Sequence, residues 1–260
     1  MTVWTRRRML AAAASQSDGN SIHHGGTLRV RRAVKTVSLQ AGFTFGKAID
    51  DCSRWEAARQ PQDAWNRAID RSVSSYDVPR KFTALGVWQL PFFRQAGRKS
   101  VLKRTLGGWQ LSGYAILEKG RPITITNNAA WPNGDFNADG RAGDRPNAPS
   151  SSVRSHGFKR SDYLTGIFKV SDFPTPTPGT NGNLGRNTYR GPGFAQVDAS
   201  VAKRFAVTER LTTQVRLDAF NVFNRVNLND PVTNLAVANF GRSTGTSTPK
   251  VFQAGLRLEF

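Results

Sequence analysis

Residues 251–260 read VFQAGLRLEF, a segment in which apolar and polar side chains alternate. The apolar side chains occupy every second position: Phe252, Ala254, Leu256, Leu258 and Phe260. In a β-strand, residues i and i+2 project from the same face, so the segment predicts a strand with one apolar and one polar face. Such a strand fits a soluble β-sandwich, and it also fits a lipid-facing barrel strand, whose alternating pattern spans about ten residues.

The same two-residue period recurs upstream and predicts six further strands. They fall within residues 27–34, 36–49, 81–92, 107–120, 194–205 and 212–224. In the last of these, the alternation slips at Phe220, as a β-bulge would make it. We therefore predict an all-β protein, an antiparallel meander of about seven long strands.

The predicted connections alternate between short and long. Long segments cover residues 50–79, 127–193 and 227–245, whereas 94–105 is of middling length and 206–210 is a tight turn. Short turns on one side and long loops on the other are typical of outer-membrane barrels. This pattern predicts a partial transmembrane β-barrel with long extracellular loops and periplasmic turns. Trp109, Phe205 and Phe260 are then expected near the periplasmic ends, and Phe45 and Phe223 near the outer ends.

Composition excludes several classes of protein. Only 38% of the 260 residues are hydrophobic, and 24 glycines and 13 prolines favour strands and loops over helices. Cys52 is the single cysteine, which excludes an internal disulfide and a thiolate metal site. The sequence has no run of about 18 apolar residues and therefore no transmembrane helix, a criterion that does not exclude barrel strands.

The net charge of +19 comes from 37 Lys and Arg against 18 Asp and Glu. Basic residues are scattered over loops and strand ends, without a basic helix or a base-stacking aromatic motif, so nucleic acid is not expected as a partner. Phosphorylated outer-leaflet lipid would attract such loops. Residues 1–26 are expected to form an irregular leader, because the apolar run 9–14 is too short for a signal peptide.

Several motifs resemble one protein family. They are GFTFGKAIDD, DVPRKFTALGVWQLPF, LGGWQLSGYAILEKGRPITI, GNLGRNTYRGPGFAQVDASVAKRF and LDAFNVFNRVN, followed by the terminal aromatic strand. Together they resemble the last strands of TonB-dependent outer-membrane receptors, and among these the Oar-like group with a carboxypeptidase-regulatory-like domain. The resemblance covers residues 27–260, which we interpret as a C-terminal β-barrel segment.

The resemblance implies a barrel of about 22 strands with an N-terminal plug, located in the outer membrane of a Gram-negative bacterium and taking up nutrients. It implies that Phe260 is the signal read by the barrel assembly machinery. The implied partners are outer-membrane lipid, the remaining strands and plug of the full-length receptor, and, through that plug, the TonB complex. Because plug and TonB box are not found in the sequence, we expect a gene fragment or a mis-called start that does not transport alone.

An acidic loop, DFNADGRAGD, offers the best motif for a metal site. Asp135, Asn137 and Asp139 stand at positions 1, 3 and 5 of a Ca²⁺-loop pattern, a glycine follows at position 6, and Asp144 could add an oxygen. Position 12 is Pro146, where a bidentate Glu is expected. The loop is therefore a weak Ca²⁺ site or an Asx-rich turn.

No catalytic arrangement is evident in the sequence, so we expect no enzyme and, apart from Ca²⁺, no cofactor. Neither a Ser-His-Asp set nor a pair of catalytic carboxylates can be argued from the spacing. An alternative to the transport function is a soluble or surface-attached β-protein, acting as an adhesin or polyanion binder, whose strands face a protein core.

Overall fold

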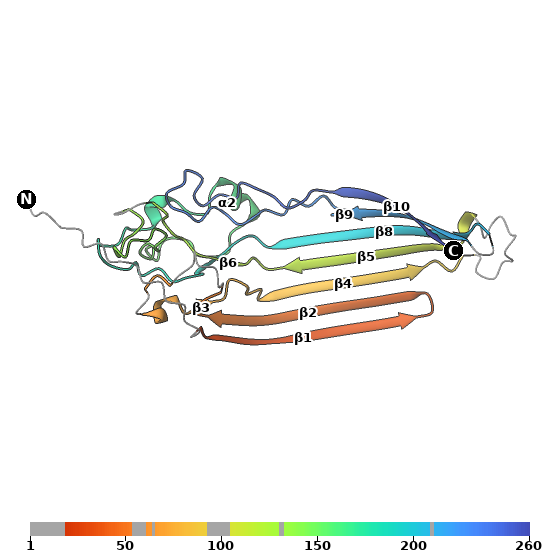
Figure 1. Ribbon diagram of the computed structural model, residues 1–260, viewed down its shortest axis with the longest axis horizontal. Coiled ribbons are helices and arrows are strands. Elements are labelled where there is room, and N and C mark those ends of the chain that lie inside the picture. Colours follow the sequence, from red (N-terminus) through yellow and green to blue (C-terminus); the bar gives the residue numbers. More distant parts are fainter. Residues whose placement is uncertain (1–18, 54–60, 64–65, 93–104, 130–132, 209–210) are drawn as a thin grey trace, which may run out of the picture.

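The computed structural model describes residues 19–53, 61–63, 66–92, 105–129, 133–208 and 211–260. Seven long antiparallel strands form one sheet in the order β1-β2-β4-β5-β8-β9-β10 (Figure 1). Their bounds are Ser21–Val34, Val37–Asp50, Arg80–Gln89, Trp109–Glu118, Phe194–Ala206, Thr212–Phe220 and Val251–Glu259. The two-residue strand β3, Ser72–Val73, pairs with β2 as the eighth strand. The predicted all-β meander is confirmed.

The strand register places the apolar positions on one continuous face of the sheet. Directly paired residues in an antiparallel sheet lie on the same face. One cross-strand row runs Leu39, Gly86, Gly113, Ala199, Ala219 and Phe252. The next row runs Ser38, Val87, Ser112, Ser200, Asp218 and Gln253. Alternation within each strand therefore adds up across the sheet to one apolar and one mostly polar face.

The two ends of the sheet differ in the way that the loop lengths predict. Lys35 and Thr36 alone connect β1 to β2, and the β8–β9 turn covers 207–211 at the same end. The opposite end, at the left of Figure 1, carries the connections β2–β4, β5–β8 and β9–β10. We call these the turn end and the loop end. The C-terminus lies at the turn end, and there Phe260 is completely exposed.

Aromatic side chains lie near both ends of the strands, as expected. Trp109 begins β5 and Phe205 is near the end of β8, both at the turn end, where Lys203 Nζ lies 4.7 Å from the centre of the Trp109 ring. Phe45 and Phe223 lie toward the loop end and are 54% and 76% exposed. Exposed rings at two levels fit the two headgroup regions of a bilayer.

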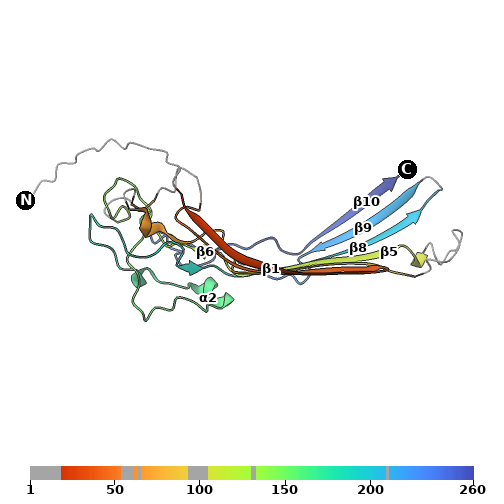
Figure 2. The same ribbon diagram turned by 90° about the horizontal axis from the view of Figure 1, so that it is seen from below.

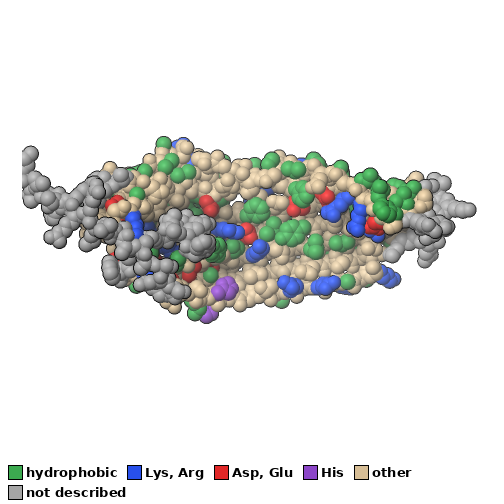
Figure 3. Space-filling view, in the orientation of Figure 1, with side chains coloured by type: hydrophobic (Ala, Val, Ile, Leu, Met, Phe, Trp, Pro, Cys, Tyr) green, Lys and Arg blue, Asp and Glu red, His purple; other side chains and the backbone are tan. Residues whose placement is uncertain are grey.

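The sheet is curved and open. β8, β9 and β10 turn away from the plane of β1 to β5 (Figure 2), and β1 and β10 form its two edges. Because neighbouring strands are antiparallel and seven is an odd number, β1 and β10 both run from the loop end to the turn end. Basic side chains follow the lower edge of the sheet in Figure 3, where β1 carries Arg29, Arg31 and Arg32.

Several strand boundaries differ from the sequence-based expectation by one or more residues, and two of these differences have a clear structural reason. β1 begins at Ser21 instead of 27, because the segment with His23 and His24 extends the pairing with β2 as far as Asp50. At the slip, Phe220 pairs regularly with Val251 of β10. On the β8 side, Asn221 adopts a positive φ of 50° and Val222 N–H donates to Val197 O at 2.8 Å, one residue beyond the register of Ala199 with Ala219, as in a β-bulge. None of the helices in the described ranges has the length and apolar character needed to span a membrane.

The loops at the loop end fold into a body with its own core. The segment 119–193 contains β6 (Pro122–Ile123), α2 (Arg160–Thr165), the 3-10 helix η2 (Val170–Asp172) and β7 (Tyr189–Arg190). Its core also receives side chains from the β9–β10 connection and consists of Ile123, Ile125, Phe168, Phe173, Leu184, Tyr189, Leu235 and Phe240. The rings of Phe168, Phe173 and Tyr189 contact one another, with centroids 4.5 to 6.1 Å apart. We call this unit the loop body.

Candidate functional site

Three ion pairs attach the loop body to the part of the chain between the end of β2 and the start of β4. They join Asp50 to Arg186, Asp70 to Arg145 and Asp77 to Arg190. All three carboxylates are buried, and in each pair the arginine comes from the β5–β8 connection. The pairs therefore hold together two parts of the chain that are far apart in the sequence.

Arg186 makes the widest set of contacts. Besides its ion pair, its guanidinium donates to the backbone oxygen of Asp50 at 2.7 Å and to Ser53 Oγ at 2.8 Å. Its Nε donates to the backbone oxygen of Asp70 at 2.9 Å. A planar guanidinium with several donors suits such a junction, because it satisfies carbonyl and carboxylate oxygens at once.

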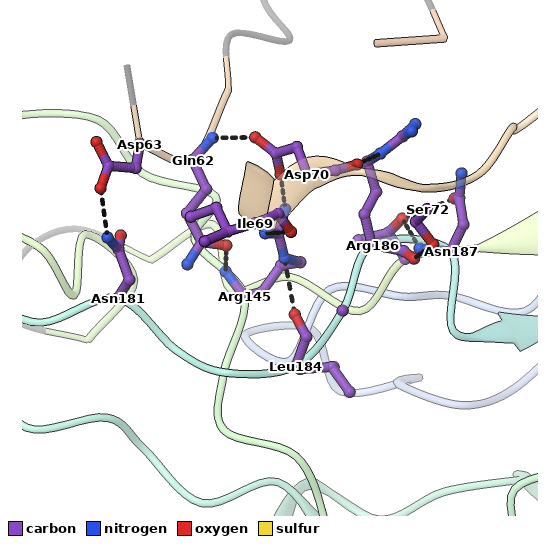
Figure 4. A network of polar contacts seen from close by, with 12 residues as sticks. Gln62, Asp63, Ile69, Asp70, Ser72, Arg145, Asn181, Leu184, Arg186 and Asn187 are labelled. Carbon is purple, nitrogen blue, oxygen red and sulfur yellow. Dashed lines mark hydrogen bonds and ion pairs between the residues drawn. The ribbon is translucent and has the colours of Figure 1, made fainter. Parts of the chain in front are cut away.

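Arg145 is the second junction and is only 5% exposed (Figure 4). Its guanidinium donates to Leu184 O at 2.8 Å and to Ile69 O at 3.1 Å. The other carboxylate oxygen of its partner Asp70 accepts the backbone N–H of Gln62 at 2.9 Å. Each guanidinium nitrogen of Arg145 and each carboxylate oxygen of Asp70 thus makes a hydrogen bond, which offsets the cost of burying their charges.

The glycine-rich segment 179–187 packs closely on Arg145. A Cβ at Gly182 would lie 2.0 Å from the backbone oxygen of Arg145, so only glycine fits there. The segment also supplies Asn187, whose positive φ of 55° orients an amide that donates to Val73 O at 2.7 Å. Gly182 therefore serves close packing between this segment and Arg145.

A polar cavity of about 840 Å³ lies beside this network. Its lining includes Tyr76, Arg121, Arg141, Asp139 and Asp230, contributed by all three connections of the loop end. Burial raises the pKa of the Asp230 carboxyl, and the neighbouring Arg121 charge opposes that increase. The cavity therefore presents charges of both signs to whatever enters it.

The acidic loop folds back on itself and closes the predicted motif into a compact turn. Gly140 N–H donates to Asp135 Oδ2 at 3.0 Å, and Asp139 N–H donates to Asn137 Oδ1 at 3.0 Å. Asn137 N–H donates to Asp144 Oδ2 at 3.1 Å, which brings the two ends of the loop together. Gly140, at position 6 of the pattern, has a φ of +91°. The structure thus places all four predicted residues in one loop.

Two of the predicted carboxylates, Asp135 and Asp144, are each only 6% exposed. Burial raises the pKa of both carboxyl groups, and the negative charge of Asp139 raises them further, against the hydrogen bonds donated by the loop backbone. Within the described ranges, no three His, Cys, Asp or Glu side chains converge closely enough to hold a metal ion by themselves. A cation here would need amide and backbone oxygens as well.

Sequence reasoning missed the six charged residues of the ion pairs. Local patterns give no sign that Asp50, Asp70 and Asp77 would meet arginines more than seventy positions later, since each pair is separated by 75 to 136 residues. Only the density of Asp and Arg within predicted loops hinted at a network. The contacts saturate these side chains and give them a structural role.

The sheet is antiparallel and open, with one apolar face, short turns at one end and an ordered loop body at the other. These features define a β-barrel membrane protein. A family model described as the outer membrane beta barrel domain matches residues 6–254, and the chain belongs to this family. It is therefore a protein of the outer membrane of a Gram-negative bacterium. Searches of curated proteins and of solved structures gave no match.

Proposed function

We propose that the chain is the C-terminal part of a TonB-dependent receptor of the Oar-like group, which takes up nutrients across the outer membrane. The observation that carries this proposal is the direction of the two edge strands. β1 and β10 run the same way, so an antiparallel closure needs an odd number of additional strands. Plugged transporters have about 22 strands, which leaves about 15, an odd number, beyond the seven of this sheet.

Apolar residues on the polar face give a second line of support. Leu85 and Tyr114 pair directly across β4 and β5 on this face and are 47% and 39% exposed. Val87 and Ile116 lie on the same face of these strands. Water in an open pore would not favour such a group, whereas a protein plug inside the barrel would cover it.

The proposal assigns a partner to each surface. Outer-membrane lipid contacts the apolar face, the remaining strands pair with β1 and β10, and the plug contacts the polar face and connects the receptor to the TonB complex. The barrel assembly machinery recognises Phe260, whose fully exposed ring lies at the turn end. In this proposal the chain is not an enzyme, does not bind nucleic acid and does not transport without those missing parts.

The genomic DNA upstream of Met1 tests this proposal directly. We expect an open reading frame that encodes an odd number of further strands and a plug domain. A stop codon directly upstream, with no such frame nearby, would contradict the receptor assignment. Fractionation tests the alternative, an adhesin or polyanion binder, because a chain that stays soluble after a carbonate wash without detergent is not integral to the membrane.

A further inference from the structure

We propose that the loop 135–144 binds one Ca²⁺ ion at the edge of the polar cavity, with Asp135 Oδ1 as its buried ligand. This site goes beyond the proposed transport function and does not depend on it. Since no three carboxylates in the described ranges converge on one point, the ligands are Asp135 Oδ1, the side-chain oxygen of Asn137, backbone carbonyls and water, and Asp139 and Asp144 add negative charge to the same loop. Ca²⁺ accepts such mixed sets of six to eight oxygens.

The first observation is an unsatisfied oxygen. Asp135 is 6% exposed, and its Oδ1 has no hydrogen-bond partner among the residues that the structure describes. An unpaired buried carboxylate oxygen costs free energy, since burial removes its hydrogen bonds to water. A cation at Oδ1 would replace the lost interaction.

The second observation is the absence of a compensating positive side chain. Among the described Lys and Arg side chains, none forms an ion pair with Asp135, Asp139 or Asp144. Where the loop body is attached to the sheet, each of the buried Asp50, Asp70 and Asp77 pairs with an arginine. The acidic loop is thus the part of this network where negative charge is concentrated without a partner.

The backbone already closes the loop on itself. Gly143 N–H and Asp144 N–H both donate to Gly134 O at 3.1 Å, so the residue before Asp135 touches the other end of the loop. The Asn137 amide nitrogen donates to Gln62 O at 2.8 Å and to Asn181 Oδ1 at 3.0 Å, so its oxygen is turned toward the loop, where it accepts the Asp139 N–H at 3.0 Å and keeps a second lone pair. Two neighbouring loops therefore fix the orientation of this ligand.

The same contacts predict the consequence of binding. Because Asn137 bonds to residues on both flanking loops, an ion that holds it would also hold the segments around Gln62 and Asn181 in place. Asp139, Gly143 and Asp144 line the cavity, so the ion would stabilise one of its walls. Ca²⁺ would thus act as a structural ion of the loop body.

Isothermal titration of the purified full chain in detergent micelles tests the site, using CaCl₂ as the probe and MgCl₂ as the comparison ion. We expect Ca²⁺ to bind with a Kd of about 10⁻⁴ to 10⁻³ M, the range of weak extracellular sites, and Mg²⁺ to bind more weakly. Asp135→Asn should weaken Ca²⁺ binding at least tenfold. The matched control is Asp172→Asn, because that carboxylate also accepts a backbone N–H, from Lys169 at 2.7 Å, but lies outside the loop.

Limited trypsin digestion of the unmodified chain provides a measurement that does not depend on any variant folding. Cleavage after Arg141 should slow at least threefold in millimolar CaCl₂ compared with EGTA. The proposal is overturned if the chain shows neither a Ca²⁺ heat signal nor protection, or if Asp135→Asn binds as tightly as the unmodified chain. None of these results bears on membrane insertion, so failure of this site is distinguishable from failure of the receptor proposal.

Discussion

Arg186 and Asp50 form an ion pair across 136 positions of the chain, and the same guanidinium also contacts the backbone oxygen of Asp50 at 2.7 Å. Asp50 is the last residue of β2, so the pair connects the transmembrane sheet to the loop body at a defined point. Both side chains are largely buried, with 13% and 7% exposure. The position of the loop body on the sheet therefore depends on a few charged contacts.

Replacing Arg186 by leucine should release the loop body. Removing one partner of a buried pair leaves an uncompensated charge, so we expect a loss of about 3–5 kcal/mol in the free energy of loop-body unfolding. Arg154→Gln is the matched control, because its pair with Asp162 is 54% and 25% exposed, and an exposed ion pair contributes little to stability. Native-state proteolysis measures both variants, and equal rates of loop cleavage would contradict the assigned role.

Single-cysteine labelling should separate the two faces of the sheet. In a background without Cys52, a lipid-soluble probe should label one set of positions, and a water-soluble probe the other, since the two faces alternate along each strand. The lipid-facing set is Leu39, Ala41, Val197, Ala199 and Leu256, and the interior set is Gln40, Asp198 and Arg257. Equal labelling of the two sets would show that the register is wrong.

An arginine should be tolerated on one face of β4 and not on the other. Ala84 and Thr83 are neighbours at the same depth, and Ala84 lies in the apolar row that pairs Ala41 with Ala115. Ala84→Arg should make membrane insertion less favourable by about 2–4 kcal/mol, if the residue lies near the midplane. Thr83→Arg, the control, should cost much less. Urea titration in lipid vesicles measures the loss of stability of both variants. Similar losses would show that the two faces of β4 are assigned wrongly.

The acidic groups of the loop body should titrate on opposite sides of the ordinary aspartate pKa of about 3.9. The backbone N–H of Lys159 and the Arg154 guanidinium lower the pKa of the exposed Asp162, whereas burial raises the pKa of Asp135 and Asp144. The hydrogen bond from Lys159 is therefore lost only as pH falls through the lowered pKa of Asp162. Stability from protonated Asp135 and Asp144 is complete below the ordinary value and is lost as pH rises through their raised values.

Carbon-13 NMR of the side-chain carboxyl groups measures these titrations in a metal-free sample. Midpoints above the ordinary value for Asp135 and Asp144 and below it for Asp162 would confirm the assignments. A midpoint for Asp135 below that of Asp162 would contradict the buried position of its carboxylate.

The isolated chain should not form uniform pores. Its open sheet leaves the backbone groups of two edge strands unpaired, and in hydrocarbon each unpaired group costs several kcal/mol. Parallel pairing of β1 with β10 would be needed for closure, in contrast to the antiparallel pattern of barrels. Single-channel recording in planar bilayers measures this. Stable pores of one conductance from the purified chain would contradict the need for additional strands.

The sequence by itself determined the transmembrane sheet. A strand shows its two faces through a period of two residues, and this signal is local, so the strand from Val251 to Glu259 could be assigned without any knowledge of its neighbours. The alternation of short and long connections then placed Phe260 at the turn end. The end of β9 was misread because the positive φ of Asn221 is a property of one residue and leaves no periodic signal.

Only the tertiary structure decided how the long connections fold. The ion pair of Asp50 with Arg186 and the hydrogen bond from Arg145 to Leu184 O depend on contacts between distant parts of the chain, which no local period encodes. The acidic loop depends on both the sequence and the tertiary structure. Its residue spacing is visible in the sequence, whereas the burial of Asp135 depends on the loops around it. Strands repeat one local rule, but the loop body forms because its apolar side chains and buried charges find partners only after the chain has folded.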